Sequence, residues 1–185
     1  MKLPAMAKLE NKFKPIKIKI GILGGTFDPA HKGHLKISIQ ARKKFNLKKI
    51  IWAITKKSPF KEKSKLSLKS RIQFAKKIIK KNTFIKVKFY ENIIRSNKTI
   101  DLINYLKKDK KLEINFIMGA DNLINFHKWH KWKSISQKCN LLVFDRQGFK
   151  DKSLKSTTFK QLSKKNLTFV RFKKVNISSS QLRKI

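Results

Sequence analysis

Short apolar segments recur along the chain, and segments with helical spacing of apolar residues separate them. Residues 16–23 read Ile-Lys-Ile-Lys-Ile-Gly-Ile-Leu, an alternation that predicts a strand. Apolar runs predict further strands at 50–54, 85–90, 114–118, 141–144 and 167–172. Apolar residues three and four apart predict helices over 35–45, 67–80 and 99–108 and one near Ile135, with Ser67 as a candidate cap.

This exchange of strands and helices predicts an α/β protein. Strands that are apolar throughout are typical of a parallel sheet that is covered on both sides. We therefore expect a Rossmann-like, doubly wound parallel sheet with helices on both faces. In such a sheet ligands bind outside the carboxyl ends of the strands. We therefore expect the functional side chains where the predicted strands end.

The length of 185 residues suits one domain of ordinary size. Residues 1–15 alternate lysine with small or apolar residues, and we interpret them as a basic, disordered tail before a single domain over 16–185. No apolar run is long enough to cross a membrane or to form a signal-peptide core. Cys139 is the sole cysteine, which excludes an intrachain disulfide and fits the cytoplasm.

The formal net charge of +38 raises the question of a nucleic-acid partner. The charge comes almost wholly from lysine, since there are six arginines: Arg42, Arg71, Arg95, Arg146, Arg171 and Arg183. Arginine is the main reader of bases, so we expect no specific nucleic-acid partner. An RNA-binding protein stays an alternative that rests on charge alone. The charge should raise encounter rates with anionic substrates.

One segment, residues 24–35, combines glycines and histidines between a predicted strand and a predicted helix. Gly24 and Gly25 let the backbone turn sharply and approach a ligand closely. The following helix start offers unpaired N–H groups and a positive dipole end, which favour phosphates. His31 and His34 are three residues apart and should lie on one face of that helix.

The segment Gly-Gly-Thr-Phe-Asp-Pro-Ala-His-Lys-Gly-His resembles the His-x-Gly-His signature of the nucleotidyltransferase superfamily, in the fuller form of the bacterial nicotinate-nucleotide adenylyltransferases. The resemblance implies that His31 and His34 are catalytic and bind the α- and β-phosphate oxygens of ATP. It also implies that the ATP site includes Gly24, Gly25, Thr26 and Phe27. The alternative interpretation is a pair of surface histidines.

The end of the chain carries a second resemblance. Residues 176–183 read Asn-Ile-Ser-Ser-Ser-Gln-Leu-Arg, similar to the Ser-Ser-x-x-x-Arg element of this superfamily. The resemblance implies that Ile177, Ser178 and Ser179 bind ATP and that Arg183 stabilises charge on the leaving pyrophosphate. Taken alone, the serines would be read as a helix cap.

Residues 117–129 are similar to the segment of nicotinate-nucleotide adenylyltransferases that leads from a strand end to a substrate-facing tryptophan. By that resemblance Gly119 and Asp121 border the adenosine, and Asp121 accepts a hydrogen bond from a ribose hydroxyl. Trp129 lies against the pyridine ring, a cationic aromatic that suits an indole face. Ordinary core or lid packing is the alternative for Trp129.

Further contacts to the acceptor follow from the same resemblance. Thr99 lies in a Ser-x-Thr-x-Asp-like helix start that would receive the nicotinate carboxylate, although it can also be read as a cap. Lys56 and Lys61 lie in the loop where the family has a Pro-Pro-His-Lys-like run, and they are predicted substrate contacts in a loop that lacks the histidine. Arg146 fits an Arg-x-Gly-aromatic strand exit and is either structural or directed at phosphate.

The implied reaction joins ATP and nicotinate mononucleotide into nicotinate adenine dinucleotide and pyrophosphate, a step of NAD biosynthesis. Magnesium would enter with ATP, and no protein metal site is expected. The alternatives are another adenylyltransferase of the superfamily, of the pantetheine-phosphate type, and an aminoacyl-tRNA synthetase fragment. Only Lys184 and Ile185 follow Arg183, where many relatives continue a helix, so a homo-oligomer is left open.

Overall fold

The computed structural model describes residues 16–57, 64–162 and 166–172. In these ranges six strands form one sheet: β1 (Ile18–Gly25), β2 (Lys49–Ile54), β3 (Ile85–Phe89), β4 (Leu112–Gly119), β5 (Asn140–Phe144) and β6 (Leu167–Val170). All six predicted strands are present. The first begins later than predicted, since Ile16 is 97 % exposed and precedes β1.

The sheet has the strand order β3-β2-β1-β4-β5-β6, and every neighbouring pair is parallel. The chain moves outward in one direction from β1 to β3, then crosses back and moves the other way from β4 to β6. The order therefore reverses between β1 and β4. Outside the carboxyl ends of these two strands lies the crevice in which ligands of doubly wound sheets bind.

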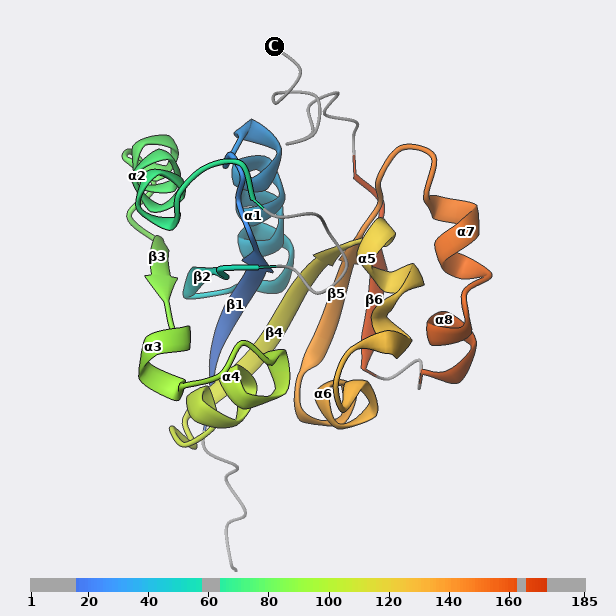
Figure 1. Cartoon of the computed structure of the whole chain (residues 1–185). Coiled ribbons are helices and arrows are strands. Elements are labelled where there is room, and N and C mark those ends of the chain that lie inside the picture. Colours follow the sequence, from blue (N-terminus) through green and yellow to red (C-terminus); the bar gives the residue numbers. More distant parts are fainter. Residues whose placement is uncertain (1–15, 58–63, 163–165, 173–185) are drawn as a thin grey trace, which may run out of the picture.

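Both faces of the sheet are apolar, and helices lie over each face (Figure 1). In β4, Phe116 and Met118 belong to one core cluster and Ile117 belongs to the other, because successive side chains of a strand point to opposite faces. The cluster with Phe116 also holds residues of α4 (Thr99–Leu106), α5 (Ala120–Ile124) and α6 (Trp132–Lys138). The other holds residues of α1 (Lys32–Phe45) and α2 (Leu68–Ile79). The predicted doubly wound parallel sheet is thus confirmed.

Several helices are too short to have been predicted. They are α3 (Glu91–Ile94), α5, the 3-10 helix η1 (Phe126–Lys128), α7 (Lys150–Leu154) and α8 (Thr157–Gln161). The Ser67 side chain caps α2 as predicted, by accepting from the Ser70 N–H. No helix in the described ranges is long and apolar enough to cross a membrane.

Candidate active site

The predicted site residues lie where neighbouring strands end. Gly25 pairs with Ile54 at the ends of β1 and β2, and Gly119 pairs with Phe144 at the ends of β4 and β5. The four segments that follow these strands therefore start from one edge of the sheet. They carry the two histidines after β1, Lys56 after β2, Asp121 after β4 and Arg146 after β5.

The turn before the histidines differs from the prediction. Gly24 and Gly25 do not turn; they are the last residues of β1 and pair with Ala53 and Ile54 of β2. The residue with a left-handed backbone is Phe27, at φ 49°. An aromatic residue seldom adopts this conformation, so the turn is held by its surroundings rather than by glycine freedom.

The two histidines form one unit at the start of α1. His31 is the N-cap residue with an extended backbone, not a member of the helix as predicted, and its Nδ1 accepts from the Gly33 N–H at 3.1 Å. His34 reaches back, and its Nδ1 accepts from the His31 N–H at 3.2 Å. The ring centroids are 3.9 Å apart. This reciprocal capping box occupies backbone donors of the helix start that we expected to face a ligand.

These bonds define what the imidazoles can donate. A neutral imidazole whose Nδ1 accepts a hydrogen bond carries its hydrogen on Nε2, so both rings are Nε2–H donors. Burial, with a smaller contribution from the charge of Arg146, lowers the pKa of His31 from its usual 6.5 to about 4. His31 is therefore neutral at physiological pH, and its Nε2 offers a hydrogen without a full positive charge.

The aromatic rings of Phe27 and Trp52 pack against the His34 ring. The Phe27 ring lies 4.8 Å from the His34 ring and stacks on Trp52, which is fully buried, at 5.0 Å. The Trp52 indole N–H donates to Ser38 Oγ at 2.9 Å, and Ser38 Oγ in turn donates to the His34 carbonyl at 2.8 Å. Ring packing thus holds the His34 imidazole, and the two hydrogen bonds from Trp52 and Ser38 hold the His34 backbone.

On the other side of the switch point, Asp121 and Arg146 form an ion pair. Arg146 Nη1 lies 2.6 Å from Asp121 Oδ2, and both side chains are partly exposed. A Cβ at Gly119 would overlap Asp121 Oδ1, so glycine is required there for the carboxylate to lie against the strand end. Arg146 also lowers the pKa of His31, so its charge acts on His31 as well as on the Asp121 carboxylate. The sequence alone leaves open whether Arg146 is structural or directed at phosphate.

The predicted acceptor residues lie on α4 and after η1. Trp129 is half-buried, with its ring 5.2 Å from Phe126 and 6.0 Å from Phe116, and it packs against the same core cluster as Ile100 of α4. Thr99 is the first residue of α4 and not its cap, because Lys98 occupies the cap position without a side-chain bond. The Ser96 hydroxyl donates to Asp101 at 2.6 Å instead.

Part of the predicted site lies outside the described residues, namely Lys61, Ile177, Ser178, Ser179 and Arg183. Lys56 is described and exposed, and its backbone N–H donates to Glu91. Within the described ranges no three His, Cys, Asp or Glu side chains group as metal ligands would.

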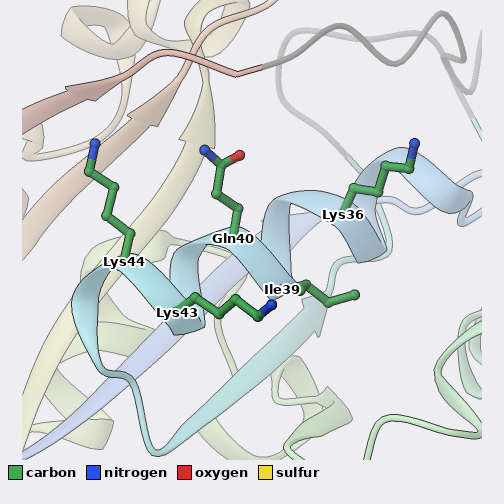
Figure 2. Close-up of a pocket in the computed structure, with 5 residues that line it drawn as sticks. All are labelled: Lys36, Ile39, Gln40, Lys43 and Lys44. Atoms are coloured by element: carbon green, nitrogen blue, oxygen red, sulfur yellow. The ribbon is translucent and has the colours of Figure 1, made fainter.

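A separate hollow of about 430 Å³ lies along the exposed side of α1 (Figure 2). It is lined by Lys36, Ile39, Gln40, Lys43 and Lys44. Gln40 is tied to the Arg171 carbonyl at 3.3 Å, beyond the end of β6. None of the predicted site residues lines this hollow, so it is distinct from the edge that carries the histidines.

Comparison with known proteins shows the family to which the chain belongs. Residues 22–185 match the family described as cytidylyltransferase-like. A Pelagibacter ubique (strain HTCC1062) protein named "Probable nicotinate-nucleotide adenylyltransferase" is 73% identical over 180 residues, which cover 97% of this chain and 100% of the relative. A protein of the same name from Bradyrhizobium sp. (strain ORS 278) is 37% identical over 131 residues, which cover 70% of this chain and 68% of the relative.

Solved structures share the fold at lower identity. The Plasmodium falciparum nicotinic acid mononucleotide adenylyltransferase complexed with NaAD superposes with a TM-score of 0.70 at 20% identity. The superposition covers 90% of this chain and 82% of that protein.

Proposed function

This chain belongs to the cytidylyltransferase-like family, among the nicotinate-nucleotide adenylyltransferases, and we propose that it transfers the adenylyl group of ATP to nicotinate mononucleotide. The products are nicotinate adenine dinucleotide and pyrophosphate, and the reaction is a step of NAD biosynthesis. The observation that carries the proposal is the pair of Nε2–H donors, His31 and His34, at the sheet edge where the strand order reverses. The 73% identity to a relative named for this activity supports the choice of acceptor.

The chemistry is a displacement at the α-phosphorus of ATP. An oxygen of the mononucleotide phosphate forms the new bond to the α-phosphorus, the bond from that phosphorus to the bridging oxygen breaks, and pyrophosphate leaves with the electron pair. The attacking phosphate is already ionised at neutral pH, so no residue has to remove a proton from it. Positioning and charge stabilisation are then the whole of the protein's task.

The residues of the turn between β1 and α1 have these roles in the scheme. His31 and His34 donate from Nε2 to phosphate oxygens, on which charge increases in the transition state. Because the protein fixes both rings before ATP binds, little reorganisation is needed. Thr26 and Phe27, at the turn between β1 and α1, border the same phosphates.

The adenosine and acceptor sites occupy the two neighbouring segments. Gly119 and Asp121 border the adenosine, and Asp121 accepts from a ribose hydroxyl while Arg146 holds its other oxygen. Trp129 lies against the pyridine ring, and the start of α4 at Thr99 receives its carboxylate. Lys56 and Lys61 attract the mononucleotide, and Ile177, Ser178, Ser179 and Arg183 complete the polyphosphate site.

Magnesium enters as part of the substrate, bound to ATP. Bound to ATP, it would neutralise part of the phosphate charge. We propose that the reaction takes place in the cytoplasm, in agreement with a buried, reduced Cys139. A measurement of the protein's mass in solution would determine whether it is a homo-oligomer.

The test is a product assay with a panel of acceptors. The purified protein is incubated with magnesium ATP and nicotinate mononucleotide, nicotinamide mononucleotide or phosphopantetheine, and the products are identified by mass. We expect nicotinate adenine dinucleotide as the main product. Dephospho-coenzyme A as the main product would assign the protein to the pantetheine-phosphate type, and no adenylylated product with any acceptor would overturn the proposal.

A further inference from the structure

Arg71 is a buried arginine that the scheme above does not use. It lies in the first turn of α2, and only 2 % of its surface is exposed. Burying a guanidinium costs free energy that an apolar side chain of similar volume would not cost. Packing alone therefore does not account for an arginine at this position, and its hydrogen bonds are the feature to explain.

The guanidinium of Arg71 binds backbone carbonyls from three segments of the chain. Nη1 donates to the Thr26 carbonyl at 2.6 Å and to the Thr55 carbonyl at 2.8 Å. Nη2 donates to the Lys56 carbonyl at 3.2 Å, and Nε donates to the Leu66 carbonyl at 3.2 Å. One side chain thus ties together the turn after β1, the segment after β2 and the start of α2.

Two carboxylates reinforce the same junction. Asp28, which is 3 % exposed, accepts from the Lys65 N–H at 2.8 Å and from the Leu66 N–H at 3.1 Å. Glu91 of α3 accepts from the Thr55 hydroxyl and from the Lys56 N–H. Both carboxylates lie close enough to stabilise the charge of Arg71. Asp28 and Arg71 therefore anchor the turn after β1, and Glu91 anchors the segment after β2.

The bond to Thr26 determines where the next N–H points. In a trans peptide the C=O and the N–H point in opposite directions. Because the Thr26 carbonyl points inward to Arg71, the Phe27 N–H of the same peptide points away from Arg71. Among the residues that the structure describes, no acceptor is found for the Phe27 N–H.

The same anchor bears on the histidines. Phe27 has the left-handed backbone of the turn, and its ring supports His34 at 4.8 Å. A turn held in this rare conformation needs bonds that over-determine it. Loss of the hydrogen bond to the Thr26 carbonyl would allow the Phe27 backbone to leave its left-handed conformation. The packing of the Phe27 ring against His34 would then be weakened.

We propose that Arg71 is a positioning residue of the adenylyl-transfer site, holding the Thr26 peptide so that the Phe27 N–H faces the bound polyphosphate and the Phe27 ring supports His34. This inference takes the identity of the substrate from the proposed function. Its own test requires only that the protein binds polyphosphate. Arg71 itself touches neither substrate nor reacting atoms.

The first experiment compares Arg71→Lys and Arg71→Met with the control Arg42→Lys, an exposed arginine that lies over the Phe84 ring. Affinity for inorganic tripolyphosphate, kcat and the KM of each substrate are measured well below the Tm of each variant. We expect both Arg71 variants to bind tripolyphosphate about tenfold more weakly, as for the loss of a hydrogen bond to a charged group. We expect kcat of both Arg71 variants to fall about 100-fold, because the Phe27 N–H and His34 would be misplaced relative to the phosphates. The KM for the mononucleotide should change little, and Arg42→Lys should behave like the parent protein.

A merely structural role would give a different result. A lower Tm with the tripolyphosphate affinity and kcat of the parent would overturn the proposal. The second experiment needs no variant: hydrogen exchange of the Phe27 amide in the parent protein, with and without tripolyphosphate. We expect fast exchange in the free protein and slow exchange in the complex, and exchange that tripolyphosphate leaves unchanged would also overturn it.

The two proposals can fail separately. If the parent protein makes no nicotinate adenine dinucleotide, while tripolyphosphate still protects Phe27 and Arg71→Lys still weakens its binding, the proposed function is wrong and the role of Arg71 stands. If the product forms and Arg71→Lys behaves like the parent, the role of Arg71 is wrong and the function stands.

Discussion

His31 and His34 bind backbone groups through Nδ1, and this leaves Nε2–H as the donor of each ring. A histidine that is neutral before the substrate arrives keeps its donor at every pH near neutrality. Charge stabilisation by His31 in the proposed reaction therefore depends on a fixed dipole and not on a proton that must first be gained. This arrangement has consequences that can be measured at single residues.

The titration of His31 is the first. Burial and Arg146 lower the pKa of His31 to about 4, so the imidazole signal should titrate near that pH in an NMR experiment on the free protein. Arg146→Gln should raise this pKa, because it removes the nearby positive charge. A midpoint near 6.5 in the parent protein would contradict the geometry.

The same shift affects stability in a defined pH window. The unfolded chain binds this proton near pH 6.5 and the folded protein binds it only near pH 4. The stability that neutral His31 contributes is thus complete above about pH 6.5 and is lost as the pH falls toward 4. Chemical denaturation at a series of pH values should show this loss, and His31→Gln should show less of it.

His34→Ala tests the catalytic role of the pair. Removing a donor aimed at transition-state charge should lower kcat about 100-fold or more while the protein stays folded. The exposed His130 offers a matched control, and His130→Ala should keep the turnover of the parent. Near-normal turnover in folded His34→Ala would reduce the two histidines to a helix cap.

At the scale of elements, long periodic segments could be predicted and short ones could not. An alternating segment predicted β1 and apolar runs predicted the other five strands, and β2, β4 and β5 are largely apolar because they are buried on both faces of the sheet. Helices such as α3, α5, α7 and α8 have four or five residues, little more than one turn, and a single turn shows no repeat. Their place is decided by packing on other elements: α5 packs on β4 and β5, α3 packs on α4, and α7 and α8 pack on α5.

The site was predictable only where its residues are consecutive. Residues 24–35 identified the histidines, yet the turn was assigned to Gly24 and Gly25 and lies at Phe27, because β1 keeps pairing with β2 to its last residue. The Arg146–Asp121 pair joins residues 25 positions apart, and Arg71 reaches carbonyls up to 45 positions away. Such contacts arise only when the strand ends meet in the folded sheet. The Arg146–Asp121 pair could have been suggested by the strand order, because β4 and β5 are neighbours.

The segment from η1 to α6 carries the prediction about the acceptor. Trp129 and Trp132 both pack against Phe126, with ring centroids at 5.2 and 6.1 Å. Trp129→Ala should weaken binding of the mononucleotide by roughly 1 to 3 kcal/mol, as for the loss of a stacked ring, with ATP binding nearly unchanged. Calorimetry with each substrate measures both effects.

Trp132→Ala is the matched control, since it also removes an indole from the same cluster. It should lower the Tm and leave the affinity for the mononucleotide close to that of the parent. If the two variants lose the same affinity, or if Trp129→Ala weakens ATP instead, Trp129 is a packing residue.

At the scale of the whole molecule, the net charge of +38 acts on every anionic substrate. Such a field accelerates encounter with anions and is screened by salt. We expect kcat/KM to fall about tenfold as salt rises from about 0.01 to 0.3 M, with kcat little affected. Binding to unrelated RNAs should disappear over the same range. RNA binding that survives high salt and depends on sequence would favour a nucleic-acid function.

The central claim is the transfer of an adenylyl group to nicotinate mononucleotide, and direct competition tests it in one reaction. The protein receives magnesium ATP with equal concentrations of nicotinate and nicotinamide mononucleotides, and the two dinucleotide products are quantified by mass at early times. The account predicts a clear excess of nicotinate adenine dinucleotide, because the N–H groups at the start of α4 favour a carboxylate over an uncharged amide. Equal amounts of the two products, or an excess of NAD, would contradict it.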